Sequence, residues 1–148
     1  SWIFLSEGLA ASEQTDLGGQ STVARFFEPG DFCANLTSVW TGDIASDDLV
    51  ALTDIVGVAF PDKVFRREYL EGGLFGTYLR LKMMNAHLFA KDLICAKTSG
   101  QTETRYRFLE QHHSTVIDSV QQKDIARFLG MTPQGLSRFL RRRKLEDS

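Results

Sequence analysis

The sequence predicts an α+β protein in which an antiparallel β-roll or sandwich is followed by helices. Residues 1–60 contain short apolar or alternating runs separated by Gly, Asp and Pro, a pattern typical of short strands joined by turns. After Phe60 the apolar residues recur at helical spacing, and the 24 residues from Leu74 to Lys97 contain no proline. Residues 121–144 then show the pattern of two helices on either side of a sharp turn. These observations divide the chain into three parts, 1–60, 61–97 and 98–148.

The strands of the first part are expected on either side of two turns. Residues 2–5 and 22–27 are apolar or alternating, and the segment 16–20 between them is rich in Asp and Gly. A second turn is expected at 28–31, and residues 44–59 contain two more apolar runs. This spacing predicts short antiparallel strands.

Two helices are predicted in the second part. Pro61 suits the first turn of a helix and Asp62 suits its positive end, so a short helix is expected at 62–71, where two glycines end it. The next helix, 74–97, would be about 36 Å long at about 1.5 Å per residue.

Two apolar faces run along this long helix. The chain's own β part can cover one of them, and the other predicts packing against the same helix of a second subunit. The alternative is a central helix within a monomeric core. The row that predicts the dimer repeats every seven residues and consists of Leu74, Leu81, Leu88 and Cys95, with Met84 alongside. The second row consists of Phe75, Leu79, Ala86, Phe89 and Leu93.

A linker at 97–101 leads from the second part into the third. Thr102 can cap a helix over 103–112, in which Tyr106 and Leu109 share a side with His113. A short connector then leads to the strongest pattern in the chain.

That pattern is a helix-turn-helix. The first helix ends at Gly130, which supplies the left-handed residue that a sharp turn needs. Met131 is expected as a buried plug in the turn, Thr132 as an N-cap and Pro133 as the first residue of the second helix. The second helix of such a motif enters the major groove and meets base edges with its N-terminal half. The expected inward residues are Ile125, Ala126, Phe128 and Leu129 in the first helix and Leu136, Phe139 and Leu140 in the second.

The candidate DNA-binding residues are polar and outward on the second helix. Arg138 can donate two hydrogen bonds to guanine, Gln134 can read adenine, and Thr132 can bind a phosphate at the helix N-terminus. The basic run from Arg141 to Lys144 can clamp phosphates, or it can be a solvated tail that suits the negative end of the helix. Thr132, Gln134 and Ser137 can equally be a cap or surface residues, and the alternative for Arg138 is a solvated helix arginine. The full set is Thr132, Gln134, Ser137, Arg138, Arg141 and Arg142.

The charge distribution favours a polyanionic partner for the C-terminal end only. The net charge is −2, but residues 1–64 contain ten acids and two bases, whereas residues 121–148 contain seven bases and three acids.

Several stretches resemble the Crp/Fnr superfamily of bacterial transcription regulators. Residues 122–140 resemble its DNA-binding element, and Thr-Pro-Gln-Gly-Leu-Ser-Arg at 132–138 resembles the start of its recognition helix. Phe-Phe-Glu-Pro-Gly-Asp-Phe at 26–32, with the strand at 3–9, resembles its cyclic-nucleotide-type β-roll. The resemblance implies a cytoplasmic, homodimeric, sequence-specific regulator that binds double-stranded DNA. It further implies that the long helix dimerises, that the β-roll senses an unknown small-molecule effector, and that RNA polymerase is a partner.

Two departures from this family pattern bear on the ligand. The family's β-roll needs more β sequence than is present here, so we expect a partial roll. Members that bind cyclic AMP carry a Gly-Glu pair and a later Arg, but residues 33–36 and 44–48 contain no Arg. Asp43, Asp47 and Asp48 stand there instead and would repel a phosphate. We therefore expect cyclic AMP to bind very weakly or not at all, and we predict no cofactor.

Other function classes find little support in the sequence. The His and Cys residues match no zinc spacing, so no metal is expected, although Cys33 can be considered as a redox sensor. No catalytic motif is present, and no apolar run approaches the ~18 residues of a membrane span. We expect neither an enzyme nor a membrane partner. The alternative is a non-enzymatic small-molecule-binding module whose C-terminal helices contact protein; steep salt dependence would favour DNA.

Overall fold

Two small antiparallel sheets make up the N-terminal part of the computed structural model, which describes residues 1–146. In the first sheet β1 lies between β4 and β6, and in the second β2 lies between β3 and β5. The predicted α+β class with a partial antiparallel roll is confirmed. The strands are β1 (Trp2–Glu7), β2 (Ala10–Thr15), β3 (Ser21–Phe27), β4 (Phe32–Cys33), β5 (Asp48–Ala51) and β6 (Val56–Phe60).

A short helix, α1 (Leu36–Thr41), lies in the part where the sequence pattern predicted only strands and turns. Asn35 caps it by accepting a hydrogen bond from the Ser38 N–H at 2.9 Å, and Gly42 ends it with φ of 78°. Val39 is its buried residue. A single buried residue in six gives too little periodicity to predict a helix, so the cap was the available signal.

The hairpin formed by β2 and β3, here called the β2–β3 ribbon, is regular except at one bulge. Pairing runs from Ala10 opposite Phe27 to Thr15 opposite Ser21, with a register shift between Ser12 and Glu13. The turn at its end was predicted at 16–20. Asp16 Oδ1 accepts hydrogen bonds from two backbone N–H groups of that turn, which fixes its shape.

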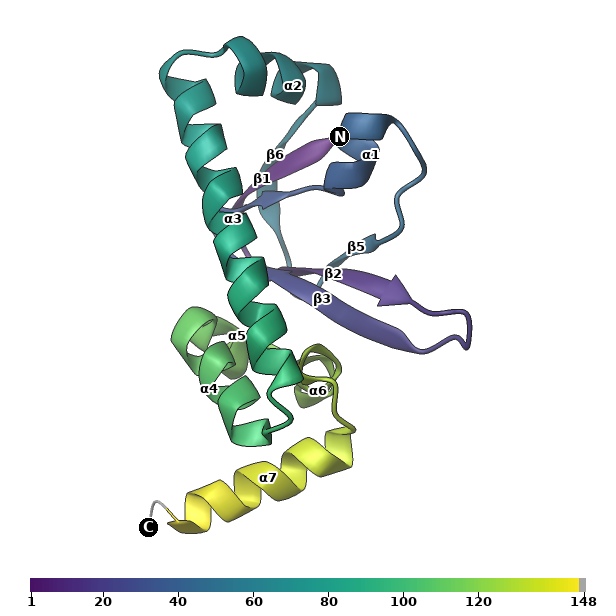
Figure 1. The fold of residues 1–148 in the computed structure, drawn as a ribbon, viewed down its shortest axis with the longest axis vertical. Helices are drawn as coiled ribbons and strands as arrows, with labels where there is room; N and C mark the ends of the chain where they lie inside the picture. Colours follow the sequence, from purple (N-terminus) through teal and green to yellow (C-terminus); the bar gives the residue numbers. More distant parts are fainter. Residues whose placement is uncertain (147–148) are drawn as a thin grey trace.

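Within residues 1–146, six helices follow the sheets, and the longest, α3, runs beside both sheets (Figure 1). The short helix α2 lies at one end of α3, and the C-terminal helices lie at the other, with α7 furthest from α2 (Figure 1). The prediction that Thr102 caps α4 is wrong, because Thr102 is itself the first residue of the helix. Gln101 is at the N-cap position, and its side chain forms no capping hydrogen bond. The helices are α2 (Asp62–Glu71), α3 (Leu74–Thr98), α4 (Thr102–His112), α5 (Ser114–Ser119), α6 (Gln122–Leu129) and α7 (Pro133–Glu146).

One hydrophobic cluster is centred on Trp2 of β1 and joins the first sheet to α2 and α3. This side chain is fully buried, stacks on Phe60 at 4.7 Å between ring centroids, and meets Phe32 and Phe65 edge-on at 4.9 and 4.7 Å. Leu79 of α3 is buried in the same cluster. The first sheet, α2 and α3 are therefore held together by aromatic packing.

The larger hydrophobic core joins the β2–β3 ribbon to the C-terminal helices. Phe26 of β3 and Phe128 of α6 are both buried, with ring centroids 4.9 Å apart, and Val23 and Leu9 lie in the same cluster as Leu136 of α7. The part predicted to bind DNA therefore shares its core with the β part. The divisions 1–60, 61–97 and 98–148 remain predictions about the chain, but this core contains residues of all three parts.

A shared core predicts cooperative unfolding. Phe128→Ala should lower the free energy of unfolding by about 3–5 kcal/mol, because it opens a cavity between ribbon and helices. Urea unfolding followed by circular dichroism should then show one transition for the sheet and helix signals, shifted to lower urea. Leu17→Ala, at a fully exposed ribbon tip, should change stability by less than about 0.5 kcal/mol. Separate transitions for the β and helical signals would contradict the shared core.

Candidate nucleic-acid interface and ligand cavity

The turn between α6 and α7 has the predicted form. Gly130 adopts the left-handed conformation with φ of 67°, and the Met131 N–H donates to the Ala126 carbonyl at 2.9 Å. The predicted inward residues of α6 are all buried. Met131 is half-buried against the core rather than fully buried, so the predicted plug is only partial.

The start of α7 is fixed by its cap and its apolar side. Thr132 Oγ1 accepts a hydrogen bond from the Gly135 N–H at 3.0 Å, and Pro133 is the first helical residue, as predicted. Leu136 and Phe139 are buried and Leu140 is half-buried. The opposite side of α7 therefore has a defined orientation toward solvent.

The outward side of α7 carries the predicted DNA-binding residues. Thr132 precedes the helix and is exposed, and the side chains of the other five are exposed and form no hydrogen bond or ion pair within residues 1–146. A groove of about 560 Å³ lies beside them, and three arginines contribute to its wall. The five exposed side chains are Gln134, Ser137, Arg138, Arg141 and Arg142.

Arg143 differs from the other arginines of α7. Its guanidinium donates to both carboxylate oxygens of Glu110 at 2.6 and 2.8 Å and lies 5.0 Å from the Tyr106 ring centre. These hydrogen bonds raise the pKa of Arg143. The phosphate clamp predicted for residues 141–144 is therefore wrong for Arg143, which fastens α7 to α4. The sequence did contain a signal for this inward position of Arg143. Arg143 lies four residues after Phe139, so the two side chains share the inward face of the helix.

Arg127 of α6 fastens the helix-turn-helix to the β2–β3 ribbon. It donates to the Glu13 carboxylate oxygens at 3.0 and 2.7 Å and to Asp124 at 3.1 Å, and it also bonds to the Ser21 hydroxyl. The Arg127 hydrogen bond is the main reason that the pKa of Glu13 is lowered. Sequence analysis missed this contact because its partners are separated by more than a hundred residues.

His113 forms a second link between the same parts. Its Nδ1 lies 2.7 Å from Glu28 Oε2, and the imidazole is almost fully buried against Phe26 and Phe89. Within residues 1–146, no group of three His, Cys, Asp or Glu side chains is placed to hold a metal. His113 thus connects α4 and α5 to the turn after β3.

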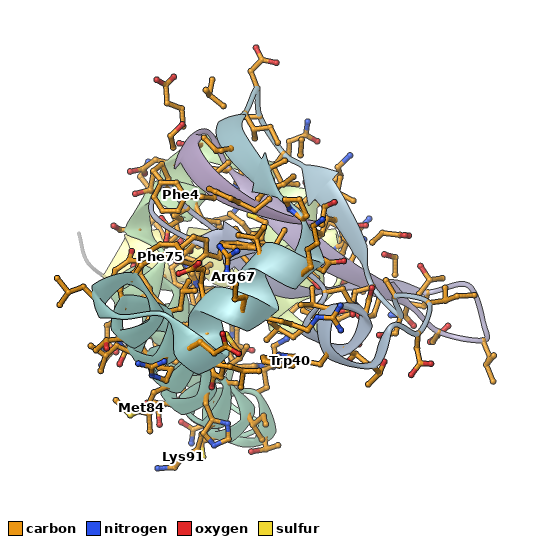
Figure 2. All side chains as sticks on the ribbon, turned by 90° about the horizontal axis from the view of Figure 1, so that it is seen from above. Phe4, Trp40, Arg67, Phe75, Met84 and Lys91 are labelled. Atoms are coloured by element: carbon orange, nitrogen blue, oxygen red, sulfur yellow. The ribbon has the colours of Figure 1, made fainter. Side chains whose placement is uncertain are left out.

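The heptad row of α3 is exposed along its length and is called the α3 stripe below. Leu74 is 93% exposed and Leu81, Met84 and Leu88 are each about half exposed. Cys95, the last residue of this row, is also exposed. Figure 2 shows Met84 pointing away from the sheets. Of the second row, Leu79 is buried and Ala86, Phe89 and Leu93 are half-buried, whereas Phe75 is exposed.

A cavity of about 310 Å³ lies between the β2–β3 ribbon, α1 and α3. Asp47 lines it and accepts hydrogen bonds from Ser46, Gln14 and Ser12 at 2.7, 2.8 and 2.9 Å. Burial raises the pKa of Asp47, but these three hydrogen bonds outweigh burial and lower it. The carboxylate is therefore ionised and already bound by donors of the protein.

The structure corrects the expected charge of this region. Asp43 and Asp48 are exposed and do not line the cavity, whereas Arg25 of β3 does. Of the three acids that were expected to repel an anion, only Asp47 therefore lies at the cavity. Cys33 is buried, and burial together with Asp31 raises the pKa of its thiol to about 11, which makes it a poor redox sensor.

Comparison with known proteins identifies the fold. No protein-family model and no curated protein matches the sequence. A regulator assigned to the Crp/Fnr family from Eubacterium rectale matches 99% of this chain and 70% of its own, with 16% identity and a TM-score of 0.72. A CRP-family transcriptional regulator of Thermus thermophilus matches 99% and 76%, with 14% identity and a TM-score of 0.73. FixK2 of Bradyrhizobium japonicum matches 99% and 75%, with 14% identity and a TM-score of 0.67.

These structural neighbours are Crp/Fnr transcription regulators, and they match essentially the whole chain. At 14–16% identity the likeness concerns the fold. The fold is therefore of the Crp/Fnr type, as the sequence resemblance implied. Among the helices of residues 1–146, none is both long and apolar enough to cross a membrane.

The contact between Glu13 and Arg127 predicts a pH-dependent stability. Because the folded-state pKa of Glu13 is lowered, its stabilisation is complete above the unfolded pKa and is lost as the pH falls through the folded value. Glu13→Gln should therefore destabilise by about 1–2 kcal/mol near pH 7 and by less near pH 3. Urea unfolding at constant protein concentration measures this difference. Glu7→Gln, at an exposed carboxylate, serves as the control, and an equal loss at both pH values would contradict the role of the ionised pair.

Proposed function

We propose that this protein is a sequence-specific DNA-binding transcription regulator of the Crp/Fnr type, a cytoplasmic homodimer whose β part senses a small molecule. The observation that carries the proposal is the outward side of α7. Its polar and basic side chains are exposed and unengaged within residues 1–146, while its inward side is fixed in the core. A helix held in this way can enter the major groove without rearranging.

The positions along α7 favour a division of roles. Gln134, Ser137, Arg138 and Arg141 follow the spacing of one helix face, so they would approach the same groove together. Arg138 is assigned to a base edge, because its planar fork matches guanine O6 and N7. Arg142 and Arg141 are assigned to phosphates. Thr132, whose hydroxyl oxygen already caps the helix, is left with its hydroxyl proton for a phosphate.

The charge distribution also favours DNA binding at the α7 end of the molecule. The three arginines beside the groove on α7 are unpaired within the described chain, whereas Arg143 and Arg127 are neutralised by carboxylates. The strongly acidic first 64 residues would be repelled by a polyanion. DNA would therefore contact the α7 end of the molecule.

The α3 stripe is assigned to dimerisation. Its leucines and Met84 form an apolar row that no part of residues 1–146 covers, although α3 packs against the sheets on its other side. Apolar side chains at a seven-residue repeat suit a parallel pair of helices related by a two-fold axis. A two-fold dimer presents two copies of α7 to a near-palindromic site, with half-sites about one helical turn apart.

The DNA assignment is tested by separating base contacts from phosphate contacts. Sites are first selected from random duplex DNA, and variants are then titrated by fluorescence on the selected and random duplexes at several salt concentrations. Arg138→Ala should lower the binding free energy for the selected duplex by about 1–3 kcal/mol, through the loss of preference at one symmetric base position. Its affinity for random DNA should be nearly unchanged. Arg142→Ala should weaken both duplexes and lower the salt slope by about one for each charge removed from the interface.

Arg66→Ala is the matched control for charge. Arg66 is exposed on α2, at the end of the molecule opposite α7, so its loss should change neither affinity nor salt slope (Figure 1). If Arg138→Ala bound every duplex as the parent does, the assignment of α7 would be wrong. The alternative, docking of the C-terminal helices on protein, would then be preferred.

The dimer assignment is tested at the centre of the α3 stripe. Leu81→Asp would bury a charge in the seam and should give monomers in sedimentation velocity. Leu81→Met keeps an apolar side chain of similar volume and should remain dimeric. A Leu81→Asp variant that sediments with the mass of the parent would contradict dimerisation through the α3 stripe.

A further inference from the structure

Two positively charged side chains meet at the last turn of α6, and neither has an acidic partner within residues 1–146. Lys97, near the end of α3, places its Nζ 4.7 Å from the ring centre of Phe128. Arg105 of α4 donates a hydrogen bond from Nη1 to the Leu129 carbonyl at 2.8 Å. Because Phe128 and Leu129 are consecutive, the two cations lie at the same junction of α3, α4 and α6 (Figure 1).

The amine of Lys97 has the surroundings of a nucleophile. A cation near the negative end of a helix is stabilising, but Arg105 already binds the last carbonyl of α6, whereas Lys97 contacts only an aromatic ring. Burial, and then the charge of Arg105, lower the pKa of Lys97. A lysine that is desolvated and lies next to another cation is an activated amine.

The guanidinium of Arg105 has a donor to spare. Its Nε is buried and has no hydrogen-bond partner within the described chain. A buried donor without a partner costs free energy, and the planar fork of an arginine matches the two oxygens of a carboxylate. A small carboxylate-like group at this junction would satisfy Nε and offset the repulsion between the two cations.

We propose that Lys97 is reversibly modified by carbon dioxide and that Arg105 binds the resulting carbamate. The lone pair of the neutral Nζ attacks the carbon of carbon dioxide and forms a C–N bond. One C–O π bond breaks, its electron pair remains on oxygen, and the nitrogen releases a proton to solvent. The product is an anion with two oxygens, so a pair of like charges becomes an ion pair. The inference goes beyond the proposed function, because it depends neither on α7 nor on DNA.

Other electrophiles fit this junction less well. An acyl donor would leave a neutral amide on Lys97 and an aldehyde would leave an imine, and neither product supplies an anion to Arg105. Carbon dioxide is small and uncharged, so it can reach a half-buried amine between other side chains. Lys91 lies on the same helix but is exposed, and it therefore serves as an internal reference.

The test traps the carbamate in the 148-residue protein without DNA. The protein is equilibrated with isotopically labelled bicarbonate and carbon dioxide, treated with triethyloxonium ion to ethylate carbamates, digested, and mapped by mass spectrometry. The trapped fraction at Lys97 should exceed that at Lys91 by roughly 10-fold or more, the low end of the range for a charge-assisted hydrogen bond.

Two matched variants of α4 test the role of Arg105. Arg105→Gln keeps an N–H donor for the Leu129 carbonyl but removes the charge, so trapping at Lys97 should fall to the level of Lys91. Arg107→Gln removes an exposed arginine of the same helix and should leave trapping unchanged. Circular dichroism establishes that each variant is folded.

Three results would overturn the proposal: no adduct on Lys97, equal adducts on Lys97 and Lys91, or a folded Arg105→Gln variant that is trapped like the parent. The comparison of the two lysines within the parent protein needs no variant, so it decides the question even if Arg105→Gln does not fold. The result is also independent of DNA binding, because no DNA is present.

Discussion

The contact between Phe26 and Phe128 fixes where the C-terminal helices lie relative to the sheets. Both rings are buried in a cluster to which β2, β3, α4, α6 and α7 contribute, so separating the ribbon from the helices would expose this apolar surface to water. Polar contacts at its edges make the docking directional. Arg127 reaches Glu13 on one side and His113 reaches Glu28 on the other. The orientation of α7 follows, because α7 packs on the same cluster through Leu136.

The β2–β3 ribbon is consequently a single layer with two different faces. Ser12, Gln14 and Arg25 line the cavity, whereas Glu13 and Phe26 contact the helix-turn-helix side. Side chains that alternate along each strand produce the two faces. The bulge between Ser12 and Glu13 shifts the register in which β2 pairs with β3. Only the thickness of one ribbon therefore separates the cavity from the residues that hold α6. An event in the cavity that displaced the ribbon would displace Glu13 with it.

Local patterns in the sequence predicted much of this architecture. The extent of α2, the long α3, the left-handed Gly130 and the cap at Thr132 all depend on residues within a turn or two of one another. The contacts that assemble the sites depend on distant residues. The bond from Arg127 to Glu13 spans 114 positions, so no spacing rule could predict it. The sequence analysis also did not place Arg25 at the cavity, because the strand that carries Arg25 precedes the segment considered there.

The basic end of the chain shows how packing divides residues that look alike in sequence. Leu136, Phe139, Leu140 and Arg143 follow the spacing of one helix face, and that face meets α4. Arg143 therefore extends over Tyr106 to Glu110, where its charge is compensated. Its neighbours on the opposite face have no acidic partner within residues 1–146. The positive surface offered to a polyanion is thus narrower than the run of arginines indicates, and it lies along the face that begins at the N-terminus of α7.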